Sequence, residues 1–215
     1  MKKVILLIVL FTSALFTSCE EVVEVDLDTA PPKLVIEASI NWQKGTTGKQ
    51  QAIKLTTTTG YFENKVPIVS GAVVYIKNSK NKRFNFTEVP KTGRYICNDF
   101  EPKIEETYTL TIISSGSTYT ASETLKSVAP ITRIEQNNKG GITGTDIEIR
   151  AFYNDPANED NFYLYKYEYS KKITSTYYVG EDKFYQGNEY FSKSDDEDIE
   201  VGNEIQITHL GISKQ

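Results

Sequence analysis

Apolar and polar side chains alternate along almost the whole chain after residue 19, and this pattern limits the fold more than any other feature. In the first such stretch Leu34, Ile36, Ala38 and Ile40 occupy every second position, and Glu37 lies on the opposite side. A period of two residues is that of a β-strand with one packed face and one wet face. No stretch after residue 19 combines apolar residues at helical spacing with a helix cap, so the sequence predicts an all-β protein.

Turn-forming residues divide the first alternating series into short strands. Gly, Asn and Ser are concentrated at residues 45–48, 78–81 and 115–117. The series gives about seven strands over residues 33–126, with turns every 8–12 residues, which is typical of an immunoglobulin-like β-sandwich. The sequence therefore predicts a β-sandwich domain over residues 33–127.

A second antiparallel β module is predicted over residues 128–215. Residues 128–130 (VAP) interrupt the alternation and mark the expected boundary between the two modules. Beyond them the chain offers only about five strands, whereas a sandwich of this size usually has about seven. We therefore expect the second module to be incomplete.

The first nineteen residues indicate export and a lipid anchor. Lys2 and Lys3 precede an apolar run, and small residues follow it, as in a secretory signal peptide over residues 1–18. Cys19 then stands where a bacterial lipobox has its acylated cysteine, so we expect palmitate there and an acidic tether over residues 19–32. A plain secretory signal with a coincidental cysteine is the alternative. Loss of Lys2 and Lys3 leaves 22 basic and 29 acidic residues, a net charge of −7.

Tyrosine is concentrated in the second module. Nine of the 14 tyrosines lie between residues 153 and 190, and four share one side of a predicted strand: Tyr163, Tyr165, Tyr167 and Tyr169. A row of exposed aromatic rings can stack on sugar rings or bind a partner protein, which makes these four a candidate binding face. The alternative is a half-buried sheet face, because tyrosine packs well in strands and keeps a polar end.

Two acidic segments are weak candidates for calcium binding. Asp155 and Asp160 lie in an oxygen-rich loop, and carboxylate oxygens are calcium ligands, although turn formation is the simpler interpretation. The acidic run at residues 195–198 lacks the glycine that an EF-hand loop needs, so we interpret it as a solvated loop. The sequence predicts no metal site beyond these candidates and no cofactor.

The remaining chemistry gives no positive sign of an enzyme. One histidine and two cysteines cannot build a zinc site of the histidine and cysteine type, and an acidic chain is not typical of a nucleic-acid binder. His209 lies on an apolar strand face and is expected to be structural. Cys97 is expected to be a buried strand residue without a disulfide partner. Paired acids such as Asp155 and Asp160 leave a hydrolase as a minor alternative.

Several motifs together resemble a known family. The lipobox and acidic tether are followed by LVIEA at 34–38, GRY at 93–95, ETYTL at 106–110, FYNDP at 152–156 and NFY at 161–163. This arrangement resembles a lipoprotein family of Bacteroidota, domain-of-unknown-function family 4249. Segments 93–95 and 106–110 are also similar to the strand pair of transthyretin-like sandwiches.

The resemblance implies a cell-envelope accessory role. Members of the family tend to be encoded beside TonB-dependent outer-membrane receptors, and no catalytic residue is implied. Members also continue past the strand predicted at 204–209 into a Gly-Asn turn and a final strand, whereas this chain ends at Gln215. That difference agrees with the shortage of strands in the second module.

We therefore expect a lipid-anchored, non-enzymatic binding or accessory protein of the outer membrane. It would work beside a TonB-dependent receptor in substrate capture or uptake, with a glycan or a peptide as ligand and no nucleic acid. The acidic residues after Cys19 resemble the surface-export signal of Bacteroidota lipoproteins, which implies display on the cell surface. A surface glycan-binding module that uses the tyrosine row is the alternative function, and fold class alone does not decide between them.

Overall fold

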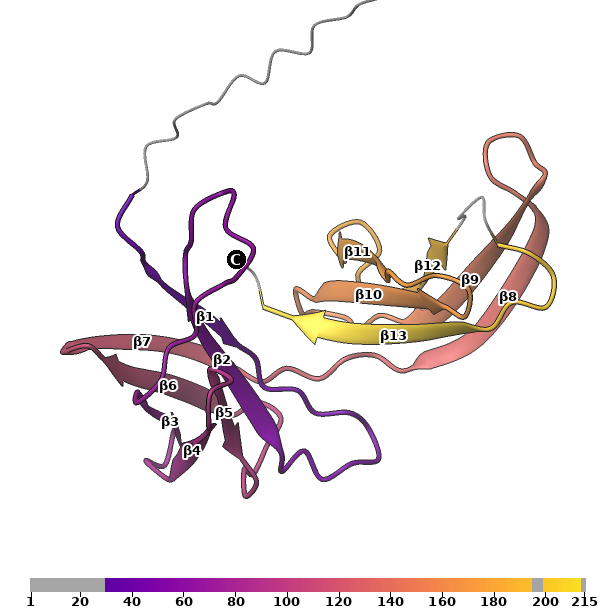
Figure 1. Ribbon diagram of the computed structural model, residues 1–215. Coiled ribbons are helices and arrows are strands. Elements are labelled where there is room, and N and C mark those ends of the chain that lie inside the picture. The colour runs from indigo at the N-terminus through magenta and orange to yellow at the C-terminus, as the bar shows by residue number, and fades with distance from the viewer. Residues whose placement is uncertain (1–29, 195–198, 214–215) are drawn as a thin grey trace, which may run out of the picture.

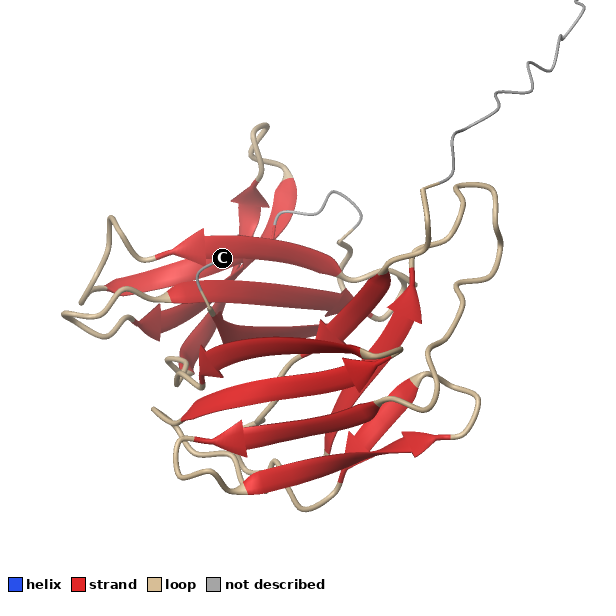
Figure 2. Cartoon of the chain, turned by 90° about the vertical axis from the view of Figure 1, so that its left-hand side faces the viewer, coloured by secondary structure: helices blue, strands red, loops and turns tan. Residues whose placement is uncertain are grey.

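The computed structural model describes residues 30–194 and 199–213, and within them the chain forms strands and no helix (Figure 2). The predicted all-β fold is confirmed. The signal segment 1–18, Cys19 and most of the tether lie outside the described residues, as does the acidic run 195–198. Within the described part there is also no helix with the length and apolar character that crossing a bilayer requires.

The first seven strands form one curled antiparallel sheet, in the order β1-β2-β5-β4-β3-β6-β7 (Figure 1). Strand β4 pairs with β3 along its first part and with β5 along its second part, so the sheet bends around it. We call β1–β7 the first half of the molecule. Its strands are β1 (Leu34–Ala38), β2 (Gln51–Thr57), β3 (Val73–Asn78), β4 (Arg83–Val89), β5 (Arg94–Cys97), β6 (Thr107–Ser114) and β7 (Ser117–Thr124).

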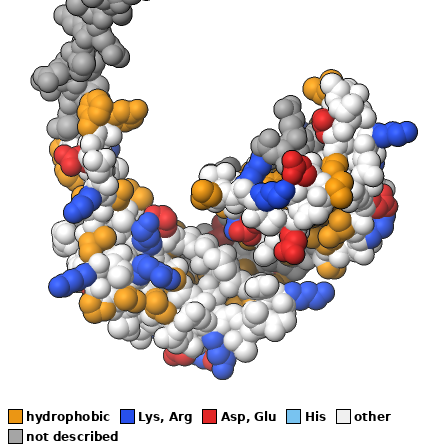
Figure 3. Space-filling model, turned by 45° about the vertical axis from the view of Figure 1, so that its right-hand side comes forward, with side chains coloured by type: hydrophobic (Ala, Val, Ile, Leu, Met, Phe, Trp, Pro, Cys, Tyr) orange, Lys and Arg blue, Asp and Glu red, His pale blue; other side chains and the backbone are white. Residues whose placement is uncertain are grey.

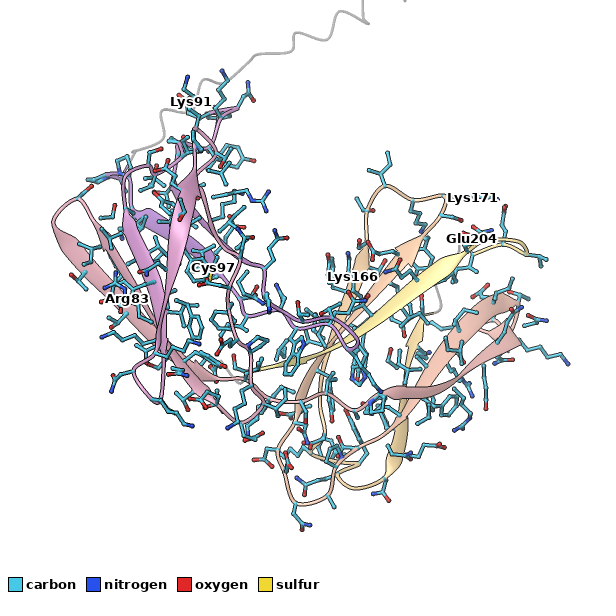
Figure 4. All side chains as sticks on the ribbon, turned by 90° about the horizontal axis from the view of Figure 1, so that it is seen from below. Arg83, Lys91, Cys97, Lys166, Lys171 and Glu204 are labelled. Carbon is cyan, nitrogen blue, oxygen red and sulfur yellow. The ribbon has the colours of Figure 1, made fainter. Side chains whose placement is uncertain are left out.

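The inner face of this sheet carries the core that the alternation predicts. On β2 the apolar side chains of Ile53 and Leu55 are buried, and Lys54 between them faces solvent. Phe100, from the loop between β5 and β6, closes the core and contacts Phe84 at a ring distance of 4.7 Å. Cys97 is also buried here, as predicted (Figure 4). The seven strands lie within the range 33–127 that the sequence indicated.

The last six strands form two small antiparallel sheets, which we call the second half. One has the order β11-β10-β13 and the other the order β12-β9-β8. The strands are β8 (Ile131–Gly140), β9 (Asp146–Asn154), β10 (Phe162–Tyr169), β11 (Thr176–Glu181), β12 (Glu189–Ser194) and β13 (Ile205–Ile212).

The two small sheets pack on each other through tyrosine. Tyr163, Tyr165, Tyr167 and Tyr169 point from β10 toward Tyr153 on β9, and all five rings are buried. The predicted exposed tyrosine face is therefore wrong for this row, because β9 and β12 cover it. The alternative interpretation, a packed sheet face, describes these residues.

Candidate functional site

A cavity of about 660 Å³ lies between the two halves of the molecule. Its inner wall is the apolar face of the curled sheet, and its outer wall comes from the ends of β10 and β13. The surface view shows the molecule hollowed between its halves (Figure 3). The side chains that make the two walls apolar are those of Ile36, Ile53, Ile76, Leu110, Ile112, Leu164, Leu210 and Ile212.

The cavity is open at β7, because none of the strands in the described part of the chain covers the inner face of β7. Tyr119 and Ala121 pair across the sheet with Ile112 and Leu110, so their side chains lie on the same face as the core. Ile112 is fully buried, yet Tyr119 and Ala121 are exposed. Apolar inner-face surface is thus left accessible at this edge, which is an unusual arrangement for a sandwich interior.

Both edge strands of the curled sheet border the cavity. β1 pairs only with β2 and β7 pairs only with β6 within the described sheet, so each has one edge without a strand partner. An edge strand presents backbone N–H and C=O groups toward that side. Among the lining residues, Glu123 and Lys126 are the charged ones, and both lie at the rim near β7. The site therefore combines an apolar floor with a polar rim.

The four tyrosines that the sequence singled out are brought together, but in the core and away from the cavity lining. The Tyr163 hydroxyl donates to Asp155 Oδ1 at 2.5 Å, and the hydroxyls of Tyr167 and Tyr169 are hydrogen bonded to Ser192 and Ser194 of β12. Burial raises the pKa of Tyr167 to about 12 and raises the pKa of Tyr163 further. These phenols stay neutral and engaged within the protein, so their row joins two sheets.

The acidic candidates are placed in a turn next to this core. Asp155 is buried, and it accepts the Tyr163 hydroxyl at Oδ1 and the Gly187 N–H at Oδ2, the latter at 3.0 Å. Asp160 is exposed, and its Oδ1 lies 3.4 Å from Gln186 Nε2. Over residues 30–194 and 199–213, no three acidic, histidine or cysteine side chains gather in a way that could hold a metal ion. Asp155 thus links the turn at 185–188 to Tyr163 of β10, with one carboxylate oxygen bonded to each.

Cys97 has the properties of a core residue. Its thiol lies 3.1 Å from Asp99 Oδ1, and burial raises its pKa to about 11. A thiol with a raised pKa carries almost no thiolate at neutral pH, and the thiolate is the reactive form. Cys97 is therefore a packing residue, as the sequence indicated.

His209 lies on β13 among the buried tyrosines. Its ring is stacked on Tyr165 at 4.8 Å and lies 4.5 Å from Tyr153 and 4.8 Å from Tyr163. Burial lowers its pKa from 6.5 to about 4, although the backbone of Ala129 acts in the opposite direction. Its position among the buried tyrosines between the two small sheets supports the structural role expected from the sequence.

This environment makes stability depend on pH. The unfolded chain binds a proton at His209 below pH 6.5, whereas the folded chain resists it down to about pH 4. The free energy of unfolding should therefore fall as the pH is lowered through this window, by up to about 3 kcal/mol from this residue. Urea unfolding at pH 7, 5.5 and 4 measures it. His209→Phe is the control, because it keeps a ring in place and removes the titration, so an equal pH slope in both proteins would contradict the expectation.

The cavity was not predicted by any sequence pattern. The alternation of the lining strand β7 resembles that of its covered neighbour β6. The one difference in β7 is that Ser and Thr flank Tyr119 and Ala121, where a covered strand has large aliphatic residues.

A family model described as a domain of unknown function, DUF4249, matches residues 20–215. No curated protein matches the chain. Among solved structures, the chain is similar to the FN1–FN3 domains of chicken CNTN1, with 17% sequence identity and a TM-score of 0.31. That match covers 78% of this chain, and it spans 58% of the CNTN1 chain. The fold class therefore rests on the sheets described above.

Proposed function

The chain belongs to the DUF4249 family, a domain of unknown function, and we propose that it is a lipid-anchored binding protein of the outer membrane. In this proposal Cys19 carries the acyl chains, and the cavity between the two halves captures a ligand. The observation that carries the proposal is the accessible apolar wall beside β1 and β7. A concave, mainly apolar site of a few hundred Å³ with a few polar groups is the usual form of a ligand pocket.

The chemistry of the walls favours an elongated, mainly apolar ligand. Aliphatic side chains from both halves form the floor, so an apolar body gains from leaving water there. The rim offers hydroxyl groups, strand-edge backbone groups and one charge of each sign, from Glu123 and Lys126, which can orient a polar end. Asp155 and Asp160 are not among the lining residues, which supports binding over hydrolysis as the function of this site.

We further propose that the protein works beside a TonB-dependent receptor. The support is the family resemblance together with the lipobox at Cys19, which would hold the protein at the same membrane as the receptor. Purification of the tagged, lipidated protein from its own outer membrane should co-purify a receptor under conditions that keep the receptor folded. Repeated recovery without any receptor would remove this part of the proposal.

A glycan-binding face on the tyrosine row is not proposed. Stacking on a sugar ring needs an accessible aromatic face. Tyr163, Tyr165, Tyr167 and Tyr169 are each less than a tenth exposed, and their hydroxyl groups are engaged inside the protein.

Ligand capture can be tested by placing a charge in the cavity. Ala121 lines it and is exposed, so Ala121→Glu should fold normally. An apolar ligand would have to desolvate the new carboxylate, which we expect to weaken binding of the apolar fluorescent probe N-phenyl-1-naphthylamine by about tenfold, or about 1.4 kcal/mol. Fluorescence titration measures the change.

The matched control is Thr118→Glu. Thr118 lies on the same strand and is also exposed, but it pairs with Ile113 on the other face of the sheet. This variant carries the same charge and should bind the probe as the unmodified protein does. Equal binding by both variants would place the probe outside the cavity.

A further inference from the structure

The loop between β2 and β3 exposes a group of large apolar side chains. Tyr61 is 86% exposed, Phe62 is 72% exposed and Val66 is 58% exposed. The rings of Tyr61 and Phe62 contact each other edge to face at 5.1 Å, so they form one aromatic tip. Exposed apolar groups of this size usually mark an interaction surface, because leaving them in water is costly. We call residues 58–68 the aromatic loop.

The base of the aromatic loop is fixed to the sheet. The Thr57 N–H donates to the Pro67 carbonyl at 3.0 Å, and the Val69 N–H donates to the Leu55 carbonyl at 3.0 Å. Thr56 and Ile68 add a β-bridge between the two stems. The tip therefore projects from a closed stem, which gives it a defined direction relative to the first half.

The aromatic loop lies where the chain enters the fold from its anchored end. The Thr58 N–H donates to the Lys33 carbonyl, and the Lys33 N–H donates to Thr58 Oγ1, both at 2.9 Å. Hydrophobic side chains gather at this end, beside the point where the grey trace begins (Figure 3). Ten residues, 20–29, lie between Cys19 and the first described residue, Ala30. Such a segment spans at most about 40 Å, so the loop stays near the surface that holds Cys19.

Basic residues accompany the aromatic tip. Lys65 lies within the loop, and Lys91 lies in the turn between β4 and β5 (Figure 4). That turn is held beside β2, because the Gly93 carbonyl accepts the Leu55 N–H at 2.8 Å. These two lysines and Lys33 outnumber the nearby acids, which are Glu63 in the loop and Glu88, whose Oε2 accepts the Gly71 N–H at 2.8 Å. Aromatic rings with flanking lysines are the composition that favours the headgroup region of a bilayer.

We propose that the aromatic loop inserts its tip into the headgroup region of the membrane that holds the acyl chains of Cys19. The inference rests on the proposed anchor and adds a second, non-covalent contact to it. An acyl anchor at Cys19 does not by itself fix the orientation of the first half, whereas the anchor and the loop together set it with this end toward the bilayer. The ligand for this surface is therefore a phospholipid interface.

Tryptophan quenching in vesicles tests the contact on the lipidated protein. In a Trp42→Phe background, Phe62→Trp puts the single tryptophan at the loop tip. Phe184→Trp puts it instead at a site that is also largely exposed, at 88%, in the loop between β11 and β12 of the second half. Both proteins are reconstituted into phosphatidylethanolamine and phosphatidylglycerol vesicles with brominated acyl chains, and pelleting with the vesicles is measured first.

Insertion predicts that emission from position 62 shifts to the blue and falls at least about twofold, as for an interfacial aromatic residue, while emission from position 184 is unchanged. Pelleting with equal emission from both sites overturns the loop contact and leaves the anchor in place. Failure of the lipidated protein to pellet overturns the anchor and the loop contact together. If the loop binds a protein and not lipid, emission from position 62 is also unquenched in these vesicles, and the lipid contact is overturned.

Discussion

Replacement of Tyr167 with alanine is expected to lower the free energy of unfolding by about 3–5 kcal/mol, the usual cost of truncating a buried large side chain. Tyr167 has no exposed surface, and its ring contacts Tyr178 edge to face at 5.7 Å. Its hydroxyl is hydrogen bonded to Ser192, so the side chain spans both sheets of the second half. Urea or thermal unfolding of the purified protein measures the loss.

Tyr177→Ala is the matched control for this substitution. Tyr177 lies on β11, in the same sheet as Tyr167, and is 56% exposed. Its truncation should change stability by no more than about 0.5 kcal/mol, as at most surface positions. Similar small losses in both variants would mean that Tyr167 is not a core residue, and would restore the tyrosine row as an exposed face.

Cys19→Ser is expected to abolish palmitate labelling and to remove the protein from the outer-membrane fraction. Each buried methylene of the proposed acyl chains contributes about 0.8 kcal/mol to membrane affinity. Loss of the acyl chains therefore removes nearly all of the membrane affinity. Metabolic labelling with palmitate, followed by membrane fractionation, measures both effects.

Cys97→Ser serves as the control for labelling. Cys97 is buried in the first core, and burial raises the pKa of its thiol, so acylation there is not expected. This variant should keep the full palmitate label even if its stability decreases. A label that persists in Cys19→Ser, or that disappears in Cys97→Ser, would contradict the anchor assignment.

The strands of the first half could be predicted because local pattern and packing agree there. On β2 the buried positions alternate with exposed ones as the sequence alternates, and the turns coincide with clusters of Gly, Asn and Ser. Strand β8 lacks the alternating pattern that predicts a strand, for a physical reason. Its segment TRIEQNNK is almost entirely polar, and as an edge strand it pairs only with β9 and remains largely exposed. A strand that is exposed on both faces needs no alternation of apolar and polar side chains.

The tyrosine row shows what alternation alone cannot decide. Tyr163 and Tyr165 occupy one side of β10 whether that side meets solvent or a second sheet. The partner that covers them is formed by β9 and β12, which are far apart in sequence, and Asp155 and Ser192, the hydrogen-bond partners of the Tyr163 and Tyr167 hydroxyls, also come from outside the strand. Burial of this row is thus a property of the tertiary pairing.

The cavity has the same origin. Ala121 on β7 and Leu110 on β6 are cross-strand neighbours with similar surroundings in sequence, yet only the edge position of β7 leaves its inner face accessible. Strand order in a sheet follows from long-range pairing, so a site formed by two edges and the ends of β10 and β13 could not be located beforehand.

Capture of a ligand in this cavity is most directly tested by native mass spectrometry of the lipidated protein purified from its own outer membrane. The unmodified protein and Thr118→Glu are expected to carry a non-covalent, mainly apolar adduct that is released on activation, and Ala121→Glu is expected to lack it. An unmodified protein without any adduct, or the same adduct on Ala121→Glu, would contradict ligand capture at this site.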